Sequence, residues 1–226
     1  MFGNRSFRFL NLFGTTVHTN LEAVGIMLAT GFAGDGWLEA ILIVASFAVG
    51  TGLHLGSHWA VALAFGNNID RMVLTRAGRI DYTGAPPGLF EDVLRTSAGP
   101  TMNALNAVAA YGVLAYVDTG GWPHEAQLGL STFAACSLIL TAVNFFPAIP
   151  LDGGLILKAL IGRFTTPGRA LRIATWISLV LMAGVFAYGV WAMQPVLVYL
   201  AVVISYDNWR THLRVPPPDT DVAVGG

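Results

Sequence analysis

His54 and His58 place two imidazoles four residues apart within a long apolar stretch. Side chains four apart on a helix lie on the same face, and two imidazoles on one face can bind one zinc ion. A lone histidine in such a stretch is more often a hydrogen-bonded packing residue. Ionisable side chains at membrane depth are generally functional, so the pair predicts a metal site.

A second segment that could do chemistry is residues 144–154, with the sequence Asn-Phe-Phe-Pro-Ala-Ile-Pro-Leu-Asp-Gly-Gly. Pro147 and Pro150 break the helix and release backbone groups. Asp152 follows directly, and a metal would neutralise a carboxylate that is costly to bury. Two histidines, one aspartate and one water would complete a tetrahedral zinc. The alternative for Asp152 is a helix N-cap before the two glycines.

The composition is that of a membrane protein. The chain has 226 residues, of which 54% are hydrophobic and 11% charged, and its mean hydropathy is +0.62. A soluble domain carries about 25% charged residues. The net charge of -1 does not indicate a nucleic-acid partner. We therefore predict an all-α polytopic protein in contact with membrane lipid.

About six transmembrane helices are predicted in one domain, residues 1–214, followed by a short cytoplasmic tail, residues 215–226. The predicted crossings are residues 20–33, 38–65, 93–117, 126–146, 171–191 and 196–205. The first and the last are short for a hydrocarbon core of about 30 Å. An apolar continuation of the fourth crossing runs to Ile161 after the proline-broken turn.

Basic residues give the orientation. With the N-terminus in the cytoplasm, all 12 Lys and Arg residues lie on the inner side, as the positive-inside rule requires. Six crossings then leave both termini in the cytoplasm, and we predict a location in the bacterial cytoplasmic (inner) membrane. The second and fourth crossings run in the same direction, so His54, His58 and Asp152 could meet inside the membrane near its cytoplasmic face.

A small cytoplasmic β-hairpin is predicted between the second and third crossings. Residues 72–75 and 79–82 flank the dipeptide Ala77-Gly78, a pattern typical of two paired strands. The hairpin is either a plain connector or an exposed strand edge to which an extended peptide could add.

With these motifs in place, the chain resembles the site-2 protease family of intramembrane zinc metalloproteases. That family pairs an H-E-x-x-H helix with a later N-x-x-P-x-x-P-x-D-G segment, which matches residues 144–153 here. Residues 98–103, Ala-Gly-Pro-Thr-Met-Asn, are similar to the family's A-G-P-x-x-N, and residues 13–18 to the entry of its first span. The resemblance extends from about residue 7 to residue 207.

The resemblance implies a zinc site and a path for another protein. The implied metal ligands are His54, His58 and Asp152. The implied path for a transmembrane substrate or partner segment passes near Asn144, Pro147, Pro150 and Asn103.

Leu55 is the departure from the family pattern, because it stands where the glutamate acts as general base and proton shuttle. Zinc lowers the pKa of its bound water but does not deliver a proton to the leaving amine. General acid–base catalysis contributes roughly 10²–10⁴ in rate. Glu39 lies ~22 Å upstream on the same helix, Glu91 and Asp92 precede the third crossing, and the Ser57 hydroxyl is a poor base.

We therefore predict a non-catalytic member of the family, a pseudoprotease. It would bind a transmembrane partner or serve as a subunit of a larger membrane complex, with zinc as the possible cofactor. One alternative is an active intramembrane zinc metalloprotease that uses an unusual base to cleave transmembrane segments. The other is a membrane protein whose histidines and aspartate bind a different cofactor or serve transport.

Overall fold

The computed structural model of the chain describes residues 7–12, 15–19, 21–74, 79–83 and 87–213. It divides into two compact units, Met1–Phe145 and Phe146–Gly226. The predicted membrane domain, residues 1–214, includes the described parts of both units and stays a prediction. The predicted tail, residues 215–226, and the predicted turn at Ala77-Gly78 lie outside the described residues.

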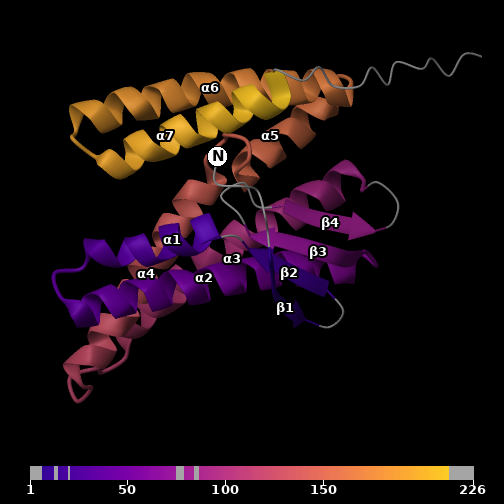
Figure 1. Ribbon diagram of the computed structural model, residues 1–226. Coiled ribbons are helices and arrows are strands. Elements are labelled where there is room, and N and C mark those ends of the chain that lie inside the picture. The colour runs from indigo at the N-terminus through magenta and orange to yellow at the C-terminus, as the bar shows by residue number, and fades with distance from the viewer. Residues whose placement is uncertain (1–6, 13–14, 20, 75–78, 84–86, 214–226) are drawn as a thin grey trace, which may run out of the picture. The chain divides into compact units, whose positions relative to one another are not determined.

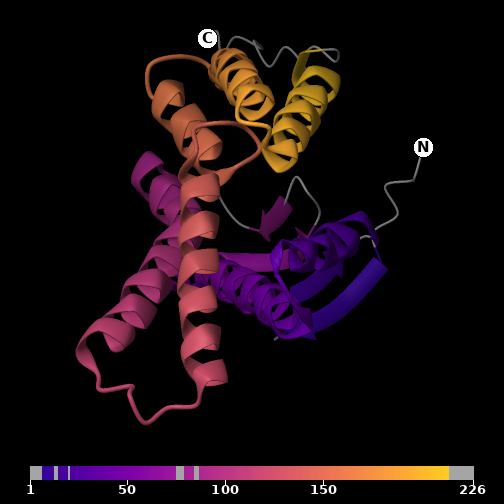
Figure 2. The same ribbon diagram turned by 90° about the vertical axis from the view of Figure 1, so that its left-hand side faces the viewer.

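The first unit combines a group of packed helices with a small sheet (Figure 1). In chain order its elements are β1 (Phe7–Leu12), β2 (Thr15–Thr19), α1 (Leu21–Ala29), the 3₁₀-helix η1 (Thr30–Ala33), α2 (Trp37–Ala64), β3 (Asn68–Leu74), β4 (Arg79–Thr83), α3 (Leu89–Tyr116) and α4 (His124–Phe145). Helices α2, α3 and α4 pack against one another. Figure 2 shows α3 and α4 as two long helices joined by one loop.

The sheet has the strand order β1-β2-β3-β4. The predicted hairpin is present as β3 and β4, which pair antiparallel with Met72 opposite Ile80 and Val73 opposite Arg79. Strands β1 and β2 were not predicted. Strand β2 pairs in parallel with β3, more than 50 residues later, and parallel pairing needs a long connection that leaves no local turn signal.

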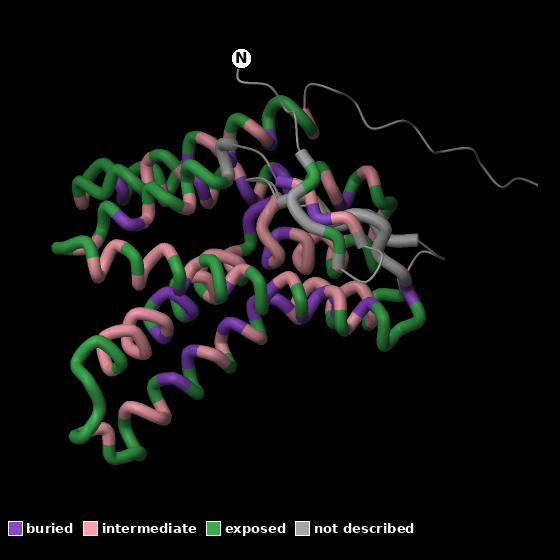
Figure 3. The backbone as a smooth tube through the Cα atoms, turned by 60° about the horizontal axis from the view of Figure 1, so that its bottom comes forward, coloured by how far each residue is buried: buried purple, intermediate pink, exposed green. Residues whose placement is uncertain are grey.

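Small and polar residues form the buried face of α2. They are Ser46, Gly50, His54, Ser57, His58 and Ala62. Apart from the adjacent Ser57 and His58, they are three or four residues apart, which keeps them on one side of the helix. Figure 3 shows this pattern, with buried residues recurring along otherwise exposed helices. A Cβ atom at Gly50 would lie 2.8 Å from Leu140 Cδ1 of α4, so this glycine lets the two helices approach closely.

Helix α2 ends at a glycine turn. Gly66 has φ +75°, and the Asn67 amide donates to the Ala62 carbonyl over 2.9 Å. A left-handed glycine with this backward hydrogen bond is a common helix C-terminus. The turn fixes the position of Asn67, whose side chain donates to Glu91 in the first turn of α3.

The second unit contains α5 (Asp152–Gly162), α6 (Pro167–Trp191), α7 (Pro195–Asn208) and the π-helical turn η2 (Trp209–Leu213). Helix α6 begins with Pro167 after Thr166, whose hydroxyl accepts from the Arg169 amide, a favoured helix start. The core of the unit is apolar. It comprises Ala148, Met182, Ala201 and Ile204, with Phe146, Leu151 and Val185 packed against it.

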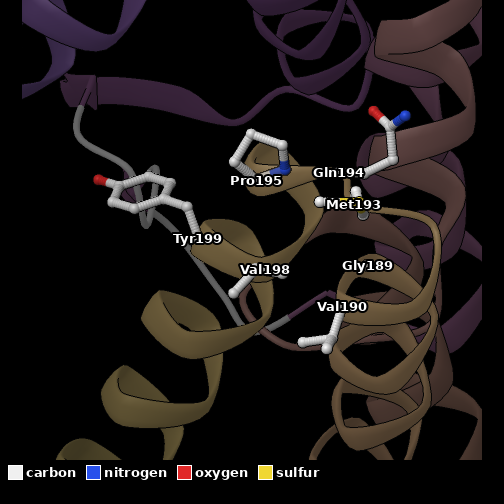
Figure 4. A pocket seen from close by; sticks show the side chains of 7 residues that line it. All are labelled: Gly189, Val190, Met193, Gln194, Pro195, Val198 and Tyr199. Atoms are coloured by element: carbon white, nitrogen blue, oxygen red, sulfur yellow. The ribbon is translucent and has the colours of Figure 1, made fainter.

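An open apolar pocket of about 430 Å³ lies where α6 meets α7 (Figure 4). It is lined by Gly189, Val190, Met193, Gln194, Pro195, Val198 and Tyr199. This lining carries no carboxylate, histidine or cysteine, so it offers no metal ligands or general base.

The described chain is a mainly helical polytopic membrane protein, as predicted. Three of its described helices, α2, α4 and α6, are long and apolar enough to cross a membrane. The described residues 21–33 form the short α1 and η1. Helix α7 has 14 residues, which at about 1.5 Å per residue is short for a crossing. The number six and the cytoplasmic termini stay predictions. Large apolar side chains such as Phe32 and Trp191, 93% and 80% exposed, are suited to lipid contact.

Candidate metal site

His54 and His58 lie side by side on the buried face of α2. Their exposed fractions are 9% and 3%, and their rings meet edge to face with centroids 4.7 Å apart. The two Nε2 atoms are 3.1 Å apart. Two nitrogens that bind one tetrahedral zinc at about 2.0–2.1 Å lie about 3.4 Å from each other. The pair therefore fits a shared zinc with little movement.

Helix α3 holds both rings through their other nitrogen. The Arg95 carbonyl lies 2.6 Å from His58 Nδ1, and the Asn103 amide lies 3.1 Å from His54 Nδ1. A carbonyl oxygen can only accept, so His58 Nδ1 carries the hydrogen and its Nε2 presents a lone pair. Outer partners of this kind orient metal-binding histidines.

Gly99 lies between these two contacts, four residues from each. A Cβ atom at this position would be 2.4 Å from His58 Nε2 and 2.5 Å from His54 Nε2. A side chain there would fill the space in front of both nitrogens, which a shared metal needs. Arg95, Gly99 and Asn103 thus form one face of α3 that matches the histidine face of α2.

In the second unit, Asp152 is the first residue of α5 and is half-buried. Leu151 occupies the N-cap, so the N-cap alternative for Asp152 does not describe this structure. A carboxylate in the first helical turn is favoured by the helix dipole. Gly154 packs directly on the preceding turn, because a Cβ there would lie 2.3 Å from the Ala148 carbonyl carbon and from Ile149 N.

The proline-broken turn before Asp152 has its backbone satisfied from two helices. Ile149 N donates to Ser178 Oγ of α6 over 2.8 Å, and Asn208 Nδ2 of α7 donates to the Ile149 carbonyl over 2.7 Å. Leu151 N donates to the Ala148 carbonyl over 2.8 Å. Buried backbone groups require such partners. The sequence analysis missed Ser178 and Asn208, although a polar residue within an apolar helix is a signal for such contacts.

Comparisons with known proteins relate the chain to known peptidases. The model of "Peptidase family M50" matches residues 123–186. A zinc metalloprotease of Methanocaldococcus jannaschii is 23% identical over 209 residues, which are 90% of this chain and 59% of that protein. The solved structure of the site-2 protease from the same organism matches with a TM-score of 0.71 and 20% identity, over 92% of this chain and 95% of that one.

These matches agree with the resemblance of the chain to the site-2 protease family. The matched residues 123–186 contain α4, the proline-broken turn, Asp152 and most of α6. The chain spans about three-fifths of the length of the zinc metalloprotease that it matches.

Leu55, which the sequence resemblance assigns to the family's glutamate position, is half-buried on α2. Two other polar groups of this helix have hydrogen-bond partners of their own. Ser57 Oγ donates to the His54 carbonyl over 2.6 Å, and Glu39 accepts from the Asp35 amide at the opposite end of the helix.

Glu91 and Asp92 are held at the start of α3. Their carboxylates lie 3.4 Å and 3.5 Å from the two terminal nitrogens of Arg95. Asn67 also donates to Glu91. These contacts engage both carboxylates, and the backbone carbonyl of the same Arg95 contacts His58 Nδ1.

The residues predicted to line a substrate or partner path have mixed surroundings. Asn144, in the last turn of α4, donates to the Leu140 carbonyl over 2.8 Å. Pro147 is exposed and Pro150 is half-buried. Asn103 is completely buried against His54. The path stays a prediction. The sequence analysis also missed the contact of the Arg95 carbonyl, because residue type does not mark a backbone group. It matched Gly99 to the family's A-G-P-x-x-N motif, which did not reveal what Gly99 contacts.

Proposed function

We propose that this chain is a non-catalytic member of the site-2 protease family that retains the zinc ligands and has lost the general base. The ligands would be His54, His58 and Asp152. The observation that carries the proposal is Leu55 at the glutamate position, beside two histidines that are still oriented to share a metal.

Both units support this ligand set. In the first unit, the paired Nε2 atoms and the absent side chain at Gly99 leave a place for one ion. Asp152 follows Phe145, the last residue of α4, by seven residues, a reach of at most roughly 25 Å. Helix α4 packs on α2, which carries the histidines. In sequence, Asp152 thus closely follows a helix that packs against the helix of the two histidines.

The proposed loss of catalysis follows from proton transfer. A bound zinc would polarise a water or a carbonyl oxygen. Peptide cleavage also needs a group that takes a proton from the water and passes it to the leaving amine. An aliphatic side chain at position 55 does neither. Ser57, Glu39 and Glu91 are each engaged with other groups, so no observation favours an alternative base.

Without hydrolysis, the scaffold would serve to bind. We propose that it holds a transmembrane segment of another protein, or joins a larger complex, in the cytoplasmic membrane of a bacterium. The one-sided distribution of Lys and Arg in the sequence supports an orientation with both termini in the cytoplasm. The exposed apolar side chains of the helices suit a hydrocarbon environment. A stable partner should survive extraction in mild detergent and remain bound to the His54→Ala variant.

Metal analysis and cleavage by the natural protein test the proposal together. Purified chain should hold one zinc and should cleave a quenched fluorescent single-span peptide no faster than its chelator-treated form does. Zinc-dependent cleavage by the natural chain would contradict the loss of catalysis. If no zinc binds at any concentration that leaves the protein folded, the retained ligand set is wrong.

A further inference from the structure

Asn103 lies directly behind His54 and is completely buried. Its Nδ2 is 3.1 Å from His54 Nδ1. In this orientation Oδ1 has no hydrogen-bond partner among the described residues. It faces Gly50 of α2, where an added Cβ would lie 4.0 Å away. A buried amide oxygen without a partner is rare and needs an explanation.

The two histidines differ in the kind of partner that α3 gives them. His58 faces a backbone carbonyl, which accepts in every state and fixes the hydrogen on Nδ1. His54 faces the side-chain amide of Asn103. This amide can donate to the ring through its nitrogen or, when the amide group is rotated to its opposite orientation, accept from the ring through its oxygen.

Each orientation of the amide selects one form of His54. When the amide nitrogen faces the ring, Nδ1 accepts, the hydrogen is on Nε2, and that N–H points at the lone pair of His58 Nε2. When the amide oxygen faces the ring, Nδ1 carries the hydrogen. Both Nε2 atoms then present lone pairs toward each other, which is favourable only with a cation between them.

We propose that Asn103 is a positioning residue that sets which nitrogen of His54 faces its partner histidine, and that its amide turns over when the metal binds. Without metal, the pair closes through a hydrogen bond from His54 to His58. With metal, the Asn103 oxygen accepts from His54 Nδ1, and both lone pairs bind the ion. The second step rests on the proposed zinc site, whereas the first concerns the metal-free protein alone.

Histidine side-chain ¹⁵N–¹H correlation spectra of the metal-free protein test the first step. The natural chain should show the His54 hydrogen on Nε2. In Asn103→Asp the carboxylate can only accept, so the hydrogen should move to Nδ1 without any metal. His58 should keep its hydrogen on Nδ1 in both proteins. An unchanged His54 in Asn103→Asp would overturn the proposal, and this result does not depend on whether zinc binds.

Zinc affinity, measured by competition with a chelator, tests the second step. Asn103→Leu should weaken zinc roughly 10–100-fold, the usual loss when the outer partner of a ligand is removed. Asn103→Asp should bind at least as tightly as the natural chain. Asn106→Leu is the matched control in the same helix, one turn away and half-buried, and should leave the affinity unchanged.

Equal weakening by the Leu and Asp variants would mean that Asn103 acts through packing alone and would overturn the proposal. If Asn103→Leu does not fold, the Asp variant still decides, because it keeps the acceptor and nearly the same volume. A natural chain that binds no zinc would count against the proposed function. In that case the metal-free spectra of the Asp variant still confirm or reject the role of Asn103.

Discussion

Each unit contains a set of buried polar side chains, and the two sets differ in what they contact. In the second unit, Ser178 and Asn208 reach into the turn and pair with the backbone of Ile149. Every one of these contacts joins a donor to an acceptor, so the turn is stabilised. In the first unit, α3 occupies the outer nitrogens of His54 and His58 and leaves the inner nitrogens directed at one another.

Burial alone does not separate a binding site from a structural contact. His58, Ser178 and Asn208 are all at most 3% exposed. The difference is that the histidines converge on a point where a side chain is missing, at Gly99, whereas the serine and the asparagine end on backbone groups. Substitutions in the first group should therefore affect metal binding, and those in the second should affect folding.

His58→Ala should have the largest effect on the metal, because it removes a ligand outright. We expect stoichiometric zinc in the natural protein and no retained zinc in this variant, measured by elemental analysis after gel filtration. His124→Ala is the control, since His124 is exposed at the start of α4. Retention of zinc by His58→Ala would mean that the ion binds elsewhere.

Gly99→Ala should weaken zinc by roughly 100-fold, at the upper end of the losses seen when the surroundings of a metal ligand are disturbed. Its Cβ would meet both imidazoles at 2.4–2.5 Å. Gly112→Ala is the matched control on the same helix, where a Cβ meets nothing within 4 Å. Chelator competition measures both affinities, and similar values for the two variants would show that the space at Gly99 is not used.

Asn208→Leu should reduce the stability of the fold and leave zinc binding unchanged. Loss of its amide leaves the Ile149 carbonyl without this partner, at a cost of about 1–3 kcal/mol. The measurement is thermal unfolding in detergent, with Asn106→Leu as the control. A normal melting temperature together with lost zinc would place Asn208 in the site and not in the fold.

The smallest effect concerns His212, in the turn after α7. Burial and the nearby Lys158 ammonium lower the pKa of His212 below its ordinary value. The unfolded chain then takes up this proton more readily, so stability should be complete above about pH 6.5 and should fall as the pH drops below it. His212→Gln should flatten this dependence, as measured by unfolding at pH 7.5 and pH 5.5. An identical acid loss in both proteins would assign it to other groups.

Patterns within one helix were predictable from the sequence. The four-residue spacing of His54 and His58 placed them on one face, and the apolar run around them matched α2 to within a residue at each end. The strand pattern around residues 72–82 gave β3 and β4. These features depend on local periodicity, which the sequence displays directly.

Contacts between distant segments were not predictable. Strand β2 pairs with β3 across α1 and α2, and His58 contacts a backbone carbonyl 37 residues away. A carbonyl is present at every position, so residue type cannot mark it. Asn103 was assigned to a substrate path by resemblance, and only its contact with His54 suggests a positioning role.

The most direct test of the lost base is a comparison of the natural protein with Leu55→Glu and Leu55→Gln, all zinc-loaded and assayed in the same detergent. The probe is a quenched fluorescent peptide with one transmembrane segment. The Glu variant should gain roughly 10²–10⁴ in cleavage rate, the usual contribution of general acid–base catalysis. The natural chain and the Gln variant, which cannot carry the proton, should stay at background. A zinc-loaded Leu55→Glu that also stays at background would contradict the account, because more than the base would then be missing.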